Sequence, residues 1–144
     1  MKKSFWGSFL FGVGIIGMLD GIIFHQILQW HSMYMPVNRH HQVMSDGYFH
    51  LAVTIIIFIS GILLWNSDPR QNEHHTRKFW GGFLLGAGIF NFLEGIIDHH
   101  ILQVHHVRPG EQQLMYDLIF DASGLLMILI GWYLYRSRKK GTKE

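Results

Sequence analysis

Apolar residues of this chain are gathered into four long runs instead of being scattered in short clusters. Each run is close to the ~20 residues that an α-helix needs to cross ~30 Å of hydrocarbon. Lipid cannot hydrogen-bond an open backbone, so runs rich in Val, Ile and Phe are also expected to be helical. The pattern predicts an all-α integral membrane protein. The four predicted spans are Phe5 to Phe24, Tyr48 to Trp65, Phe79 to Ile97 and Leu118 to Tyr135.

The first and third predicted spans have nearly the same sequence. At an offset of 74, residues 5–31 and 79–105 share 17 identities in 27 positions, and the other two spans match more weakly at an offset of 71. We therefore predict a four-helix bundle of two tandem helical hairpins, related by a pseudo-two-fold axis along the membrane normal. The predicted segments are a first repeat over 5–65, a linker over 66–78, a second repeat over 79–135 and a basic tail over 136–144.

The twelve Lys and Arg residues are distributed unevenly about these spans. Ten lie in the terminal segments and the linker, whereas only Arg39 and Arg108 lie between paired spans. Because cytoplasmic segments carry an excess of Lys and Arg, both termini and the linker are predicted to be cytoplasmic. Residues 32–45 and 106–113 are then the outer loops.

Composition narrows the chemistry that such a protein can carry. Charged residues make up 15% of the chain, against roughly 25% in ordinary soluble domains. The absence of Cys excludes disulfides and thiolate metal sites, while 11 His residues remain available. The pI near 9.0 comes without a nucleic-acid motif, so we expect no nucleic-acid partner. The expected partner is the lipid bilayer, with a homodimer or a second membrane protein left open.

Ionisable side chains lie inside the predicted spans, where lipid tolerates them only if they are paired or functional. Counting from the cytoplasmic ends at about 1.5 Å per residue gives two layers, roughly 22 Å and about 28 Å from the inner face. Each span contributes one residue to each layer. The first layer holds Asp20, His50, Glu94 and Asp121, and the second holds His25, Asp46, His99 and Asp117.

Carboxylates and imidazoles from facing helices form the dimetal sites of some four-helix bundles. We therefore predict an intramembrane transition-metal site in the outward-facing half, most simply a site for two ions. Acids would bridge or cap the ions, and imidazoles would supply nitrogen. This donor set suits Zn, Fe or Mn, and imidazole also suits Cu. The candidate ligands are Asp20, His25, Asp46, His50, Glu94, Asp98, His99, Asp117 and Asp121.

Spacing along the helices bears on which of these residues share an ion. Asp46 and His50 are four residues apart and lie on one helical face, as do Asp117 and Asp121. Asp20 and His25 are five apart, which turns them about 140° from each other in an α-helix. We therefore expect that Asp20 and His25 do not both point at the bundle axis.

Other functions remain open from the sequence. His25 and His99 are the candidate axial ligands of a b-type haem, although such a pocket needs no cluster of acids. The polar residues could instead join helices by hydrogen bonds or form a proton or cation path. A copper or metal transporter or chaperone would use the Met33, Met35, His40 and His41 loop. His31 and the His105-His106 pair are interpreted as outer-loop residues. Whether a bound metal is catalytic, in redox or hydrolytic chemistry, is not decided by residue types.

The doubled segments FWG(S/G)FL and (D/E)GII(F/D)H(Q/H)ILQ(W/V)H resemble a family of small bacterial predicted membrane proteins that carries a domain-of-unknown-function label. The resemblance covers nearly the whole chain. It implies a four-helix fold in a bacterial inner membrane, and no catalytic residue, since no activity is attached to that family.

Overall fold

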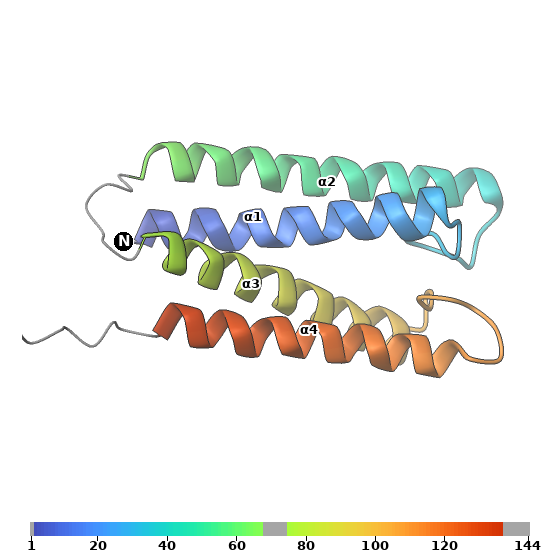
Figure 1. Cartoon of the computed structure of the whole chain (residues 1–144). Coiled ribbons are helices and arrows are strands. Elements are labelled where there is room, and N and C mark those ends of the chain that lie inside the picture. Colours follow the sequence, from blue (N-terminus) through green and yellow to red (C-terminus); the bar gives the residue numbers. More distant parts are fainter. Residues whose placement is uncertain (1, 68–74, 137–144) are drawn as a thin grey trace, which may run out of the picture.

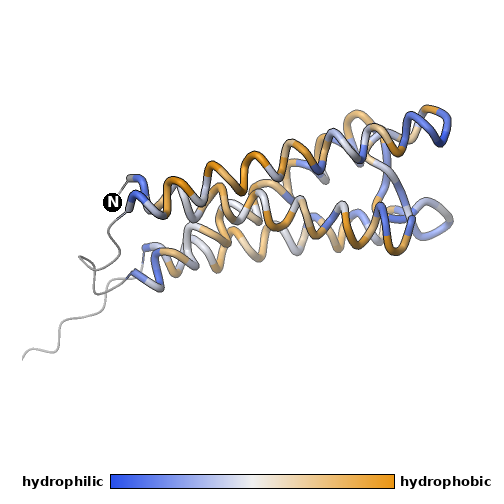
Figure 2. The backbone as a smooth tube through the Cα atoms, turned by 90° about the horizontal axis from the view of Figure 1, so that it is seen from above, coloured by the Kyte–Doolittle hydropathy of each residue, from blue (hydrophilic) through white to orange (hydrophobic). Residues whose placement is uncertain are grey.

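A computed structural model describes residues 2–67 and 75–136 of the chain. All the regular secondary structure of the described part is helical, which confirms the predicted fold class. Four continuous helical segments are long and apolar enough to cross a membrane: Lys3–Ile27, Arg39–Trp65, His75–Ile101 and Gln113–Arg136. Their middles are apolar and their ends hydrophilic (Figure 2). The elements are α1 (Lys2–Asp20), the π-helix η1 (Gly21–Ile27), α2 (Arg39–Trp65), α3 (His75–Glu94), the π-helix η3 (Gly95–Ile101) and α4 (Gln113–Arg136).

Helix α2 is longer than the apolar pattern predicts. It begins at Arg39 instead of Tyr48, so residues 39–45 are helical and not part of an outer loop. The extended backbone and side chain of Asn38 explain this start, because its Oδ1 accepts a hydrogen bond from the backbone N–H of His41 at 3.1 Å.

Two other predicted boundaries also shift. Helix α3 begins at His75, inside the predicted linker, and α4 begins at Gln113 instead of Leu118. Residues 68–74 of the linker and residues 137–144 of the basic tail lie outside the described residues.

The helices follow the order α2, α1, α3, α4 across the molecule (Figure 1). Helices α1 and α3 run in the same direction and pack against each other in the middle, while α2 packs on α1 and α4 on α3. The two central helices are therefore the more buried ones. Helices α2 and α4 present apolar faces to the outside, as expected of helices in lipid.

Glycines let α1 and α3 approach closely. A Cβ atom on Gly12 would collide with the carbonyl oxygen of Phe83, and a Cβ atom on Gly86 would collide with that of Phe9. The two glycines are 74 positions apart, and so are the two phenylalanines, so each repeat makes the same contact with the other. Small residues at such a seam are typical of membrane helices that pack backbone to backbone. The close approach brings together the C-terminal ends of α1 and α3, which carry the duplicated acids, and the π-helices η1 and η3, which carry duplicated histidines.

Candidate metal centre

The backbone hydrogen-bond pattern changes from α-helical to π-helical directly after an acidic residue in each central helix. This residue is Asp20 in α1 and Glu94 in α3. In the π-helices that follow, N–H groups bond five residues back, as at the end of η1 from Leu28 to Ile23 at 2.8 Å. This pattern places residues five apart on the same face. The expectation that Asp20 and His25 diverge is therefore wrong, because it assumed α-helical geometry. Oδ2 of Asp20 lies 3.2 Å from Nε2 of His25.

The chain turns back sharply after each π-helix. Gln29 and Gln103 adopt left-handed conformations with φ of 52° and 49°, which is uncommon for a residue other than glycine. A left-handed residue after the end of a helix reverses the chain direction. His31 and His105, two residues later, return to the bundle and are 3% and 2% exposed. Both residues lie in loops, as interpreted from the sequence, but their side chains are buried.

Two groups of buried side chains result, one in each sequence repeat. Within each group, one donor atom from each of three residues lies within 4.8 Å of the others. Each group offers one carboxylate and two imidazoles from equivalent positions. We call them the first triad, Asp20, His25 and His31, and the second triad, Glu94, His99 and His105.

The two triads meet at His31 and His105. Their rings stack 3° from parallel with centroids 4.6 Å apart. Nδ1–H of His31 donates to the carbonyl oxygen of Val107 at 2.8 Å, and Nδ1–H of His105 donates to that of Met33 at 3.1 Å. These bonds leave each Nε2 with its lone pair free. Burial, and next the neighbouring His105, lower the pKa of His31 to about 4, so its imidazole is neutral at neutral pH.

Two of the predicted ligands, Asp46 and Asp117, lie beside His25 and His99, on the side of each imidazole that faces away from its triad. Oδ1 of Asp46 is 2.9 Å from Nδ1 of His25, and Oδ1 of Asp117 is 3.5 Å from Nδ1 of His99, although neither contact is aligned as a hydrogen bond. Both acids also accept backbone N–H groups at 2.7 Å and 2.9 Å. Carboxylates in this position orient metal-binding histidines from behind.

The donor atoms facing into the triads lack hydrogen-bond partners among the described residues. Buried polar atoms are nearly always paired, so a concentration of unpaired ones requires an explanation. Donors of a tetrahedral metal ion, each about 2.0–2.2 Å from it, lie roughly 3.3 Å from one another. Glu94 Oε1 and His105 Nε2 are 3.7 Å apart, and Asp20 and His25 are closer still. The residues therefore fit a transition-metal ion. The unpaired atoms are Nε2 of His25, His31, His99 and His105, Oδ2 of Asp20 and both carboxylate oxygens of Glu94.

The remaining predicted ligands lie beside the triads. The His50 imidazole occupies the space where a Cβ of Gly21 would stand, and Asp121 does the same at Gly95. Nδ1 of His50 faces the side-chain amide of Gln26 at 3.4 Å, and neither triad includes His50. Oδ2 of Asp121 is 2.8 Å from Nε2 of His100, a residue that the sequence did not single out as a partner. Asp98 is half-buried next to the second triad and lines a cavity there.

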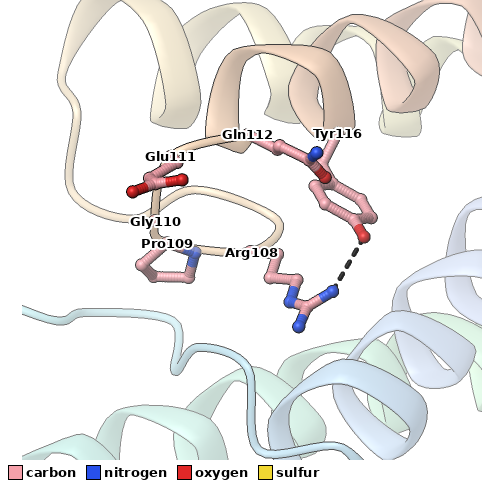
Figure 3. A pocket seen from close by; sticks show the side chains of 6 residues that line it. All are labelled: Arg108, Pro109, Gly110, Glu111, Gln112 and Tyr116. Carbon is pink, nitrogen blue, oxygen red and sulfur yellow. Dashed lines mark hydrogen bonds between the residues drawn. The ribbon is translucent and has the colours of Figure 1, made fainter.

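Arg108 links the loop after η3 to the loop after η1. Its Nη1 donates to the hydroxyl of Tyr116 at 2.8 Å (Figure 3). Its guanidinium also lies 5.1 Å from the ring centroid of Trp30, in the first repeat. A cation over an aromatic face is worth about 0.5–1 kcal/mol at an exposed site. The link holds the loop that carries His105 next to the loop that carries His31. The adjoining cavity, about 260 Å³, is lined by residues of the second outer loop and the start of α4 and by none of the triad residues.

Comparison with known proteins places this arrangement in a family. Neither a curated protein nor a solved structure matches the chain. Residues 7–138 match the family model described as "Predicted membrane protein (DUF2243)", a match that includes both triads. The chain therefore belongs to this DUF2243 family of predicted membrane proteins.

Proposed function

We propose that the protein is a membrane metalloprotein that binds two transition-metal ions, one in each triad, near the outer end of the bundle. The observation that carries this proposal is the shared orientation of four buried imidazoles. In each of them Nδ1 faces an oxygen atom, while Nε2 faces the triad without a hydrogen-bond partner in the described chain. Fixing one ring nitrogen in this way directs the other toward a metal.

The ligand count favours a reactive ion over a structural one. Structural zinc sites use four protein ligands, whereas catalytic sites use three and leave a position for water or substrate. One carboxylate and two imidazoles also form the facial set of non-haem Fe(II) enzymes. Fe and Zn are therefore the favoured metals, with Mn and Cu as further outcomes. A bound ion would supply Lewis-acid or redox chemistry. The residues of the chain would bind it and orient its ligands.

The other interpretations have less support. A carboxylate lies 3.2 Å from Nε2 of His25, on the side that a haem iron would need. Hydrogen bonding between helices would not leave both oxygens of Glu94 unpaired. His41 in the proposed transport loop is exposed and bonds to Asn38.

Elemental analysis of the detergent-purified chain, prepared without an affinity-tag metal step, tests the proposal. We expect two Fe, Zn, Mn or Cu ions per chain, and loss of both ions when His31→Ala and His105→Ala are combined. His41→Ala is the matched control and should retain both ions. One Fe with a Soret band in the visible spectrum would instead support haem. Protein that stays free of metal after metal is supplied would overturn the proposal.

A further inference from the structure

A cavity of about 190 Å³ lies between α2 and α3 beside the second triad. Phe49 from α2 and Phe90 from α3 stack in its wall, with ring centroids 6.3 Å apart. Most of its surface is apolar, and its two acidic residues are close to one another on α3 and η3. The lining residues are Met33, Phe49, Phe90, Leu93, Glu94, Ile97 and Asp98.

The cavity reaches from the outer surface of a membrane span to a buried carboxylate. Leu93 and Ile97 are 49% and 42% exposed, and both belong to the span His75–Ile101. Exposed apolar side chains at this position on a membrane helix face hydrocarbon. Glu94, their neighbour in the lining, is only 7% exposed and has no hydrogen-bond partner among the described residues for either oxygen. The cavity therefore joins the lipid face to a donor group of the second triad.

We propose that this cavity admits a small apolar molecule from the bilayer, sideways between α2 and α3, to the second triad. A cavity of about 150 Å³ is large enough to hold benzene in a protein interior. An apolar wall selects against hydrated ions, because a polar solute would lose its water there without replacement. Resting on the proposed function, this assigns the metal centre a substrate that is dissolved in lipid and not carried by water.

The reactivity of Glu94 toward two carbodiimides tests this route. A carboxyl group adds its O–H across one C=N bond of a carbodiimide, and rearrangement to the N-acylurea retains all atoms of both reactants. Metal-free protein in liposomes, carrying Asp98→Asn so that Glu94 is the single acid lining the cavity, is treated with lipid-soluble dicyclohexylcarbodiimide. A parallel sample receives a water-soluble cationic carbodiimide on both sides of the membrane. Peptide mass spectrometry then locates the adduct. We expect Glu94 to react with the lipid-soluble reagent at least tenfold more.

Matched variants show whether the cavity is the route. Leu93→Trp fills its mouth, whereas Leu19→Trp changes the equivalent exposed position of the first repeat, which does not line it. We expect Leu93→Trp to reduce labelling of Glu94 at least tenfold and Leu19→Trp to leave it unchanged. Equal labelling by both reagents, no labelling of Glu94, or no effect of Leu93→Trp would overturn the route. Since labelling is measured without metal, failure of the metal proposal appears separately, in the elemental analysis.

Discussion

The imidazole rings of His31 and His105 are stacked 3° from parallel, and each donates a hydrogen bond to a backbone carbonyl of the opposite sequence repeat. The proposed metal sites and the contact between the repeats therefore use the same side chains. Neither ring can rotate without losing its hydrogen bond across the interface.

Removing the carboxylate of one triad should remove one metal ion and not both. Asp20→Asn removes the carboxylate of the first triad, and Glu94→Gln removes that of the second. We expect each variant to bind one ion per chain, measured by elemental analysis after metal is supplied and the excess removed. Exposed Glu111 provides the control, and Glu111→Gln should bind two. Two ions in both triad variants would show that these acids are not ligands.

Asp46→Asn should weaken binding at the first triad without abolishing it. The amide oxygen can still accept the backbone N–H of Met33, but it cannot support His25 as a carboxylate does. Loss of such an outer partner costs 10–100-fold in metal affinity in known metal sites. Competition with a chelator of known affinity measures the change. If Asp46 orients His25, the variant should still fill the first triad at saturating metal, with its affinity for the metal lowered by about that factor. If Asp46→Asn lost the ion altogether, Asp46 would be a ligand.

Substitutions of glycine should have opposite effects at the central seam and on the outer helix. Gly12→Ala or Gly86→Ala would place a methyl group against a backbone carbonyl of the other central helix, and should destabilise the fold by about 1–3 kcal/mol each. Gly61→Ala meets nothing within 4 Å and should stabilise α2 by roughly 0.5–1 kcal/mol. Thermal unfolding in detergent compares the variants. Equal Tm values for Gly12→Ala and Gly61→Ala would contradict the tight α1 to α3 contact.

The distribution of Lys and Arg predicts that both termini and the linker between the repeats are cytoplasmic. Helices α1 and α3 begin at the end of the bundle where α4 ends (Figure 1), and their terminal turns hold Lys3, Arg77 and Arg136. Because the native chain lacks Cys, single cysteines can report the orientation. In intact bacteria expressing the protein, a membrane-impermeant maleimide should label Glu111→Cys. It should label Asn66→Cys only after the membrane is permeabilised. The reverse pattern would show the opposite orientation.

The sequence by itself determined the four spans and four of the six residues of the two triads. Bilayer thickness fixes the length of an apolar helix, so spans can be counted from composition alone. Lipid penalises charge, which made Asp20, Glu94, His25 and His99 conspicuous. The duplication was a further signal. His31 and His105 are the last identical pair of the longest duplicated segment.

The tertiary structure decided which of these residues meet. A five-residue spacing gives divergent side chains in an α-helix and a shared face in a π-helix, and sequence does not state which hydrogen-bond pattern forms. Here Gly21 and Gly95 leave room for side chains of the neighbouring helices at the start of each π-helix. Left-handed Gln29 and Gln103 then turn the chain inward. These are contacts and backbone angles set by packing between segments far apart in the chain. Each triad lies within one repeat, but its three side chains became visible as a group only in the folded structure.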